Sequence, residues 1–506
     1  MTIVTLFLYV GLVAALLTGL IFWSRKSQFH FADSFLQNFA GVLFIFSGFV
    51  KAVDPLGTAY KMEQYFTAFE DTCNGSFLKF LAPLFPLLSK YAISFSVFMI
   101  VLEIVLGIML IIGYRRKLSA WLFFIIMIFF TILTGFTFLT GYVPTDVNFF
   151  EFGKWVEFNK TNMRVTDCGC FGDFIKLEPK ISFIKDLILM VPACWFLFRW
   201  KNEHQLFSPI IRTGITCMSV LGLLLFSFSN FVWNEPVWDF RPFSNGIDIK
   251  SKLKAEQKAQ ADVEIIAYRI KSKIDKREMD VPYKDFLDSF KKNSNFKANW
   301  ETLDQIKSEP SIPRTKISDF DILSLDGQSM TDFILDESRY NLMIISPKVK
   351  YESSVIEEER IDTIYKMDTT IIKLKKRDSL VISKQVAGTQ SKKYKRNQYQ
   401  WDEEYLNTLK TKFLPLIDSV RNDGVTASAV FGLLTEEGIA DLKEKSGIDF
   451  PCYEADDLLL KTILRSNPGL ILLKDGKIIH KWHKNQLPKP EELRVKYLNL
   501  LGNKIY

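Results

Sequence analysis

Six long apolar runs decide what this chain can fold into. They occupy residues 3–23, 37–50, 91–113, 118–142, 183–200 and 208–232. A helix needs about 20 apolar residues to cross a bilayer, and most of the runs reach that length. The second and fifth runs are short, and we expect tilt or snorkelling neighbours to extend them. The first run lacks the basic start and small-residue cleavage site of a removed signal peptide. We therefore expect an α-helical membrane bundle of about six spans.

Composition divides the chain into two parts. Its 45 phenylalanines gather in the first half, whereas the charged residues gather in the second. This division predicts a membrane part followed by a large water-soluble part. The net charge of +7 is mild and lies largely in short clusters, so it gives no argument for binding nucleic acid. Six scattered cysteines are too few for a disulfide scaffold.

Basic residues in alternate short loops predict the orientation in the membrane. Lysine and arginine concentrate in cytoplasmic loops. The basic residues that follow the first, third and fifth runs are Arg25, Lys26, Arg115, Arg116, Lys117, Arg199 and Lys201. Six spans place all of these inside, and they place the N-terminus and everything after about residue 233 outside. We expect a multi-pass protein of the inner (cytoplasmic) membrane with a periplasmic N-terminus and C-terminal domain. Five or seven spans would put the soluble part inside.

The soluble part changes character along its length. "NEPVWDFRPFSNG" predicts a collar on the membrane surface, and residues 262–310 predict a small β/α segment. From about 318, short apolar strands alternate with helices, and Asp475-Gly476 predicts a hairpin. Residues 349–400 interrupt this pattern with basic clusters, which usually indicate solvated loop. The expected divisions are 1–34, 35–205, 206–235, 236–317, and 318–506 with its insertion at 349–400.

The first half resembles the DoxX/MauE superfamily of small membrane proteins. The resemblance is carried by "GVLFIFSGFVKAVDPLGTAYKMEQY" at 41–65, "EIVLGIMLIIG" at 103–113 and "DCGCFGD" at 167–173. It implies a four-helix core, with the first and last spans as additions. DoxX-type members are linked to thiol and quinone chemistry, and MauE-type members to maturation of a disulfide-containing dehydrogenase in the cell envelope. The whole architecture is similar to a subfamily typical of Bacteroidetes.

The C-terminal part resembles a thioredoxin fold over residues 318–502. The element order fits, and "SNPGLILL" stands where thioredoxins carry a cis-proline, which implies that Pro468 is cis. The resemblance does not include the redox motif, because "IISPKVKYESS" stands in place of the C-x-x-C that follows the first central strand of a redox thioredoxin. Without a thiolate pair the domain cannot perform exchange. We therefore expect a docking surface for a client protein.

A C-x-C motif stands in an expected external loop. Cys168 and Cys170 could form a small, strained and therefore easily exchanged disulfide in an oxidising compartment. Alternatively, Gly169 and Gly172 build a structural turn, with the thiols inert or bridged to Cys73. Sequence cannot decide the pairing. No histidine lies in the external loops of the bundle, so we expect no metal site.

Charged residues inside or beside the spans are the other candidates. Glu103 falls near the middle of the third span, where a carboxylate is costly and should face the interior. Lys51, Asp54 and Asp186 lie at span ends and could surround one polar pocket with it. Such a pocket would be a proton relay or hold a quinone headgroup. Alternatively, the charges form an internal ion pair that fixes helix register. Spacing leaves open whether Lys51 reaches Glu103.

Two functions follow from these features. The first is an envelope accessory or assembly factor, whose non-redox thioredoxin-like domain docks a client protein. The second is a membrane thiol oxidoreductase, in which Cys168 and Cys170 pass electrons to a quinone near Glu103 and Lys51. A transporter is weaker, because no internal repeat is evident. Nothing resembles a nucleophile elbow, phosphate-binding loop or dinucleotide fingerprint.

Overall fold

The computed structural model describes residues 2–24, 30–292, 296–374 and 377–498. The chain divides into two compact units. The first comprises Met1–Phe320 together with Lys461–Pro488, and the second comprises Asp321–Leu460 with the C-terminal segment from Lys489. A membrane bundle occupies most of the first unit, and a parallel sheet forms the centre of the second.

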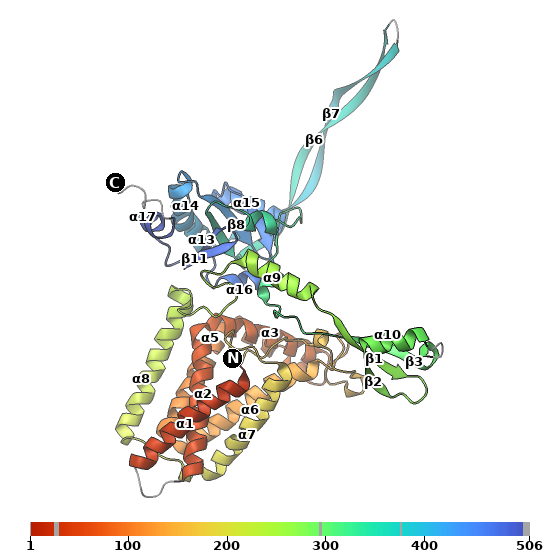
Figure 1. Cartoon of the computed structure of the whole chain (residues 1–506). Helices are drawn as coiled ribbons and strands as arrows, with labels where there is room; N and C mark the ends of the chain where they lie inside the picture. Colours follow the sequence, from red (N-terminus) through yellow and green to blue (C-terminus); the bar gives the residue numbers. More distant parts are fainter. Residues whose placement is uncertain (1, 25–29, 293–295, 375–376, 499–506) are drawn as a thin grey trace, which may run out of the picture. The chain divides into compact units, whose positions relative to one another are not determined.

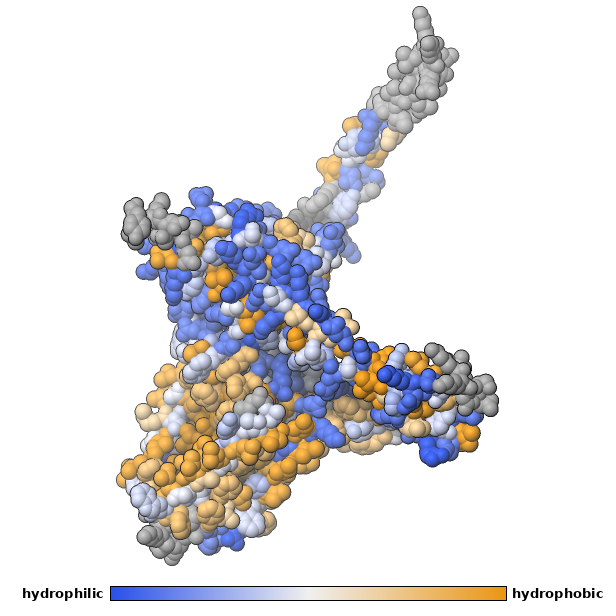
Figure 2. All heavy atoms as spheres, in the orientation of Figure 1, coloured by the Kyte–Doolittle hydropathy of each residue, from blue (hydrophilic) through white to orange (hydrophobic). Residues whose placement is uncertain are grey.

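Six helices of the described residues are long and apolar enough to cross a membrane, as predicted. The two short apolar runs become full-length helices because flanking residues join them, including Lys51 after the second run and Pro179 before the fifth. The bundle presents a mostly hydrophobic surface, whereas the strand-rich part is mostly hydrophilic (Figure 2). The spans are α1 (Ile3–Ser24), α2 (Phe31–Val53), α5 (Ala92–Ile112), α6 (Arg116–Thr140), α7 (Pro179–Arg199) and α8 (Pro209–Phe228).

Helices α2 and α5 touch through glycines. A methyl group added at Gly41 would lie 2.8 Å from the carbonyl oxygen of Gly107, and one added at Gly107 would lie 2.7 Å from that of Gly41. One added at Gly48 would lie 2.5 Å from Cγ1 of Ile104. Small residues allow such close backbone approach in membranes, where packing replaces the hydrophobic effect between helices. This contact fixes the two helices that carry Lys51 and Glu103.

Helix α3 (Pro55–Asn74) lies at the end of the bundle where α2 stops (Figure 1). Asp54 begins it by accepting a hydrogen bond from the backbone N–H of Gly57, with Pro55 in the first turn. Tyr65 and Phe66 on its buried face pack with Phe136 of α6. Short turns follow on both connections at this end: η1 (Lys79–Leu81), α4 (Leu84–Lys90), η2 (Phe152–Lys154) and η3 (Lys160–Asn162).

The remainder of the first unit is smaller. After α8 comes a π-turn, η5 (Ser229–Trp233), and then α9 (Ile249–Ala261). An antiparallel sheet in the order β2-β1-β3 follows, with α10 and α11 beside it. The predicted hairpin at Asp475-Gly476 is present between β10 (Gly469–Lys474) and β11 (Lys477–His483), and the Asn467–Pro468 peptide bond before it is cis. The other bounds are β1 (Ile265–Ser272), β2 (Glu278–Pro282), α10 (Tyr283–Lys292), α11 (Phe296–Asn299) and β3 (Trp300–Lys307).

The second unit is an α/β structure. Its strands are hydrogen-bonded in the order β5-β8-β9-β4, parallel from β5 to β9 and antiparallel between β9 and β4. Every residue of β5 is buried, as its apolar sequence predicts. The elements are η6 (Lys316–Asp319, just before the unit), β4 (Ile322–Leu323), α12 (Thr331–Leu335), β5 (Asn341–Ser346), α13 (Glu403–Thr408), η7 (Leu409–Phe413), α14 (Leu414–Arg421), β8 (Thr426–Phe431), α15 (Glu436–Ser446), β9 (Cys452–Ala455), α16 (Asp457–Ile463), α17 (Pro490–Glu492) and η8 (Leu493–Tyr497).

The insertion at 349–400 is not solvated loop, and that expectation was wrong. Strands β6 (Tyr351–Leu374) and β7 (Arg377–Trp401) form one long antiparallel hairpin (Figure 1). Two lysines of the second basic cluster fit the pairing, because Glu357 faces Lys395 and Glu359 faces Lys393 across the ladder. At the base, Trp401 donates to Asp441 at 2.6 Å.

Candidate functional site

The Cys168–Cys170 loop is a defined turn just before α7. Gly169 and Gly172 have φ of +61° and +51°, a left-handed region that glycine enters without strain. The side chain of Asp167 accepts from the backbone N–H of Gly169 at 3.1 Å. Ser47 of α2 donates to the carbonyl oxygen of Cys170 at 2.8 Å. These bonds fix the loop against the bundle, with both thiols free and half-buried.

The two thiols differ in acidity. A hydrogen bond from Cys170 and the nearby Lys185 ammonium lower the pKa of Cys168, although burial opposes them. The same hydrogen bond, together with burial, holds the pKa of Cys170 well above its usual range. A thiolate, and not a thiol, is the nucleophile in exchange. Cys168 is therefore suited to attack a disulfide as the thiolate, whereas Cys170 is suited to act later as the resolving thiol.

A buried ion pair crosses from α2 to α5 near this loop. Nζ of Lys51 lies 2.7 Å from Oε2 of Glu103, and both side chains are almost inaccessible. Lys51 therefore does reach Glu103, which the sequence left open. The ammonium also lies over the ring of Phe130, 4.8 Å from its centroid. Pairing compensates two charges that would be costly alone in the membrane.

A second buried ion pair joins Lys185 and Asp186 of α7. The sequence pattern pointed to Asp186 but not to Lys185. Thr134 of α6 donates to the other carboxylate oxygen of Asp186 at 2.9 Å. Lys185 was missed because helical neighbours normally point apart. The available signal was a lysine inside "FIKDLIL", an otherwise apolar start of a span.

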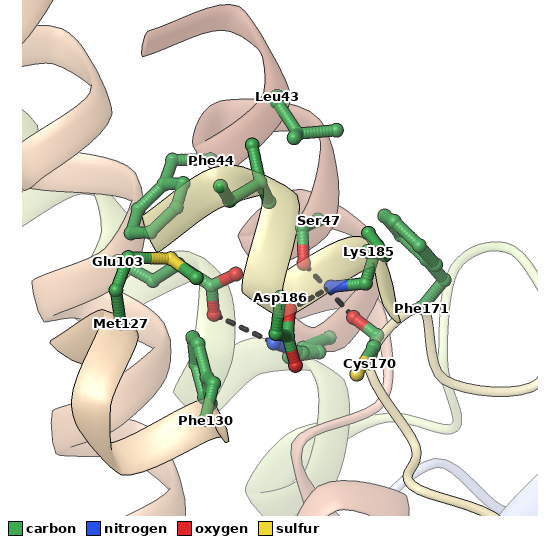
Figure 3. A pocket seen from close by; sticks show the side chains of 12 residues that line it. Leu43, Phe44, Ser47, Glu103, Met127, Phe130, Cys170, Phe171, Lys185 and Asp186 are labelled. Carbon is green, nitrogen blue, oxygen red and sulfur yellow. Dashed lines mark hydrogen bonds and ion pairs between the residues drawn. The ribbon is translucent and has the colours of Figure 1, made fainter. Parts of the chain in front are cut away.

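Both ion pairs line one cavity, together with Cys170 (Figure 3). The cavity measures about 20 Å³, and a water molecule requires about 10–15 Å³. Sites for drug-sized ligands measure about 300–1,000 Å³, so a quinone ring does not fit this space. The other lining residues are Leu43, Phe44, Ser47, Met127, Phe130, Phe171 and Leu189.

Asp54 does not face this cavity. Besides beginning α3, its carboxylate pairs with Arg465, whose Nη2 lies 2.6 Å from Oδ2. Burial disfavours its charge, but Arg465 outweighs burial and holds the pKa of Asp54 below its usual value. The structure thus brings together Lys51, Glu103 and Asp186, and it places Asp54 elsewhere.

Arg465 belongs to a buried charge cluster that the sequence analysis did not find. The backbone N–H groups of Arg465 and Ser466 donate to Glu235. Glu235 also pairs with Arg241 at 2.9 Å, and Asp239 pairs with Arg241 at 2.6 Å and with Lys481 at 2.5 Å. Its members come from "NEPVWDFR", "ILRSNPG" and "IIHKWH", which carry no local signal of mutual contact.

Helix α3 covers the cysteine loop. Lys61 lies 3.2 Å from Asp167, and its Cγ lies 3.1 Å from where a Cβ of Gly169 would stand. Cys73 lies twelve residues further along the same helix than Lys61, which is about 18 Å at 1.5 Å per residue. A disulfide requires Cα atoms within about 7 Å. Cys73 therefore does not reach the pair in this arrangement.

Together these features define a multi-pass membrane protein with a thiol pair and buried charges at one end of its bundle. Residues 30–145 match the family model described as methylamine utilisation protein MauE. The matched stretch is less than a quarter of the chain. It contains Lys51 and Glu103 but ends before Cys168. No curated protein and no solved structure matches the chain. Within the described residues, no three His, Cys, Asp or Glu side chains converge as a metal site.

Proposed function

We propose that this chain is a membrane accessory factor that exchanges thiols and disulfides with client proteins outside the cytoplasm. One observation carries the proposal: Cys168 and Cys170 stand in one half-buried turn, where the pKa of the Cys168 thiol is lowered and that of the Cys170 thiol is raised. The ammonium of Lys185, which pairs with Asp186 inside the bundle, lies near enough for its charge to favour the thiolate form of both. The similarity of residues 30–145 to MauE supports an accessory role in a membrane.

The basic loops support the proposed compartment. Nη1 of Arg116 donates to the backbone carbonyls of Lys201 and Glu203 at 2.7 and 2.8 Å. Two of the basic loops therefore meet at one end of the bundle. By the positive-inside rule this end is cytoplasmic. The cysteine loop lies at the end of the fourth span opposite Arg116, and this orientation favours a place in the envelope, where disulfides persist.

The exchange needs only the two thiols and the client. The Cys168 thiolate attacks a client disulfide, forms a mixed disulfide and releases one client thiolate. Cys170 then loses its proton and attacks the sulfur of Cys168, which releases the second client thiolate. The client gains two electrons, and Cys168 and Cys170 become a disulfide. A dithiol on a second client reverses these steps and restores the pair.

The buried charges support this reaction at defined points. The Lys185 ammonium stabilises the Cys168 thiolate, and Asp186 holds that ammonium in place. Cys170 lines the cavity that Glu103 and Asp186 also line, so its proton can leave into this water-sized space. Lys185 and Asp186 are positioning residues, whereas Cys168 and Cys170 are catalytic.

The thioredoxin-like second unit serves as a docking module in this proposal. Its one cysteine, Cys452, is buried, and burial raises the pKa of its thiol to about 11. After β5 the chain continues with Pro347-Lys348-Val349, with no thiol where exchange would occur. This unit would hold a client while the membrane pair reacts.

Trapping of mixed disulfides tests the proposal. In membranes, Cys170→Ser should accumulate a covalent complex with client through Cys168, since the second step is blocked. Cys168→Ser should accumulate none. Cys194→Ser, which removes an exposed thiol of α7, is the matched control and should behave as the native chain. If both loop variants are abundant, form no complex and leave envelope disulfides unchanged, the proposal is wrong.

A further inference from the structure

A bare apolar stripe lies between α3 and α5. Its five large side chains are spaced three and four residues apart, and they run from a turn through η1 into α4. Without a membrane their exposed fractions run from 46 to 77%. The stripe consists of Phe77, Phe80, Leu84, Leu87 and Tyr91. Single exposed apolar residues are common, but a contiguous row marks a contact surface.

The opposite face of this segment packs onto the bundle. Ala82 is buried, and Phe85 lies against Phe69 of α3, with 5.7 Å between ring centroids. Leu88 joins the same cluster beneath Phe66 and Phe136. The segment is therefore held in place on one side, while the stripe stays largely exposed among the described residues and Phe77 alone has an aromatic neighbour, Phe150.

The aromatic surface continues onto the loop before the cysteines. Phe77 lies 5.3 Å from Phe150, and Phe152 lies 5.2 Å from Trp155, measured between ring centroids. Phe149 contacts Phe150, Phe152 and Trp155 and so joins the rings into one cluster. Its exposed edge is aromatic, which is typical of side chains at the boundary between lipid and water.

Exposed lysines flank the stripe. Lys79 stands between Phe77 and Phe80, Lys90 precedes Tyr91, and both are exposed. Lys154 is exposed beside Phe152, although Glu151 pairs with it at 3.2 Å. Long lysine side chains can extend from an apolar surface to reach phosphate oxygens.

We infer that residues 77–91 and the aromatic cluster at 149–155 insert into the lipid headgroup region on the cysteine-loop side of the membrane. The stripe is continuous with the lipid-facing surface of α5, and this favours lipid as the partner that covers it. Tyr91 leads directly into α5, whose exposed Ile93 and Phe98 face lipid in a membrane-spanning helix. The stripe and flanking lysines together match an interfacial amphipathic segment. This anchor fixes the depth of α3, and it does not depend on the proposed thiol exchange.

Site-specific photocrosslinking tests the inference. The full chain, with p-benzoylphenylalanine at the position of Phe80, is placed in nanodiscs of phosphatidylethanolamine and phosphatidylglycerol and irradiated. Mass spectrometry should find lipid adducts within threefold of the yield at the position of Phe98. The position of Phe333, 63% exposed in the second unit, is the control for solvent exposure and should give at least tenfold less. A yield at Phe80 as low as at Phe333, or crosslinks mainly to a second copy or another protein, would overturn the inference.

Discussion

Arg465 and Asp54 stand 411 positions apart in the chain, yet their side chains form a buried ion pair at 2.6 Å. Arg465 also lies over the ring of Tyr60, 5.4 Å from its centroid. Tyr60 and Asp54 belong to the first turns of α3, and the next residue, Lys61, contacts Asp167 of the cysteine loop. One helix therefore contacts both the segment before Pro468 and the proposed exchange site.

Removal of this pair should destabilise the first unit. Arg465→Met leaves Asp54 buried without its partner, which typically costs about 3–5 kcal/mol. Asp54→Asn keeps an oxygen that can accept from Gly57. The double variant should therefore lose less than the sum of the single losses, as measured by thermal unfolding in nanodiscs. The lowered pKa of Asp54 implies stability that is present above 3.8 and lost as pH falls through the folded-state value. If the losses of stability in the two single variants simply add in the double variant, Asp54 and Arg465 do not interact as a pair.

The two loop thiols should react with iodoacetamide at different rates. At pH 7, Cys168 should be alkylated at least tenfold faster than Cys170, because its pKa is lowered and that of Cys170 is raised. Lys185→Gln should slow Cys168 several-fold, since it removes the stabilising ammonium. Peptide mass spectrometry over time gives both rates in one sample. Equal rates, or no effect of Lys185→Gln in a folded protein, would refute the assigned roles.

The ion pair between Lys51 and Glu103 should show a strong double-mutant effect. Glu103→Gln or Lys51→Gln alone leaves an unpaired charge in the bundle and should cost about 3–5 kcal/mol. The double variant should regain much of this loss. The exposed pair of Lys160 and Glu178, at 3.8 Å, is the control, and its single changes should stay within about 1 kcal/mol. Thermal unfolding in nanodiscs measures the five variants against the native chain. A double variant as unstable as the sum of the singles would show that the charges act independently.

Glu203 should make stability depend on pH. It follows the fifth span, and neither carboxylate oxygen has a hydrogen-bond partner within the part of the chain that the structure describes. Burial raises its pKa to about 8. The unfolded chain releases this proton near 4.5, so stability should fall as pH rises from 4.5 to 8 and then level off. Glu203→Gln removes that penalty, on the order of 1–3 kcal/mol at pH 8.5. Melting temperatures at pH 5, 7 and 8.5 measure it, with Glu178→Gln as an exposed control. A gain independent of pH would exclude ionisation as its cause.

Local sequence patterns predicted the elements better than the contacts between them. Hydropathy identified six spans, because each span must satisfy its length and apolar requirement by itself. The hairpin at Asp475-Gly476 was predicted from two adjacent residues whose backbone geometry the turn requires. Both predictions depend only on neighbours in the chain, which is why they could be made without a structure.

The partners of charged residues depend on distant segments, and they escaped prediction. Asp54 looked like a member of the membrane pocket because it follows Lys51 by three residues, but α2 ends between them. Its partner, Arg465, lies in another part of the chain entirely. The 349–400 insertion was mistaken for loop because its basic clusters were judged alone. Two lysines of these clusters, Lys393 and Lys395, face glutamates on the opposite strand, which only the pairing register reveals.

The close contact between α2 and α5 limits how the cavity beside Cys170 can open. Gly41 and Gly107 hold the two backbones together, and Gly48 approaches Ile104 only three residues before Lys51. The two helices therefore touch along most of the length that leads to the ion pair of Lys51 and Glu103. They cannot part beside Lys51 without also parting at Gly48. A molecule larger than water that enters beside Cys170 would have to displace a whole helix.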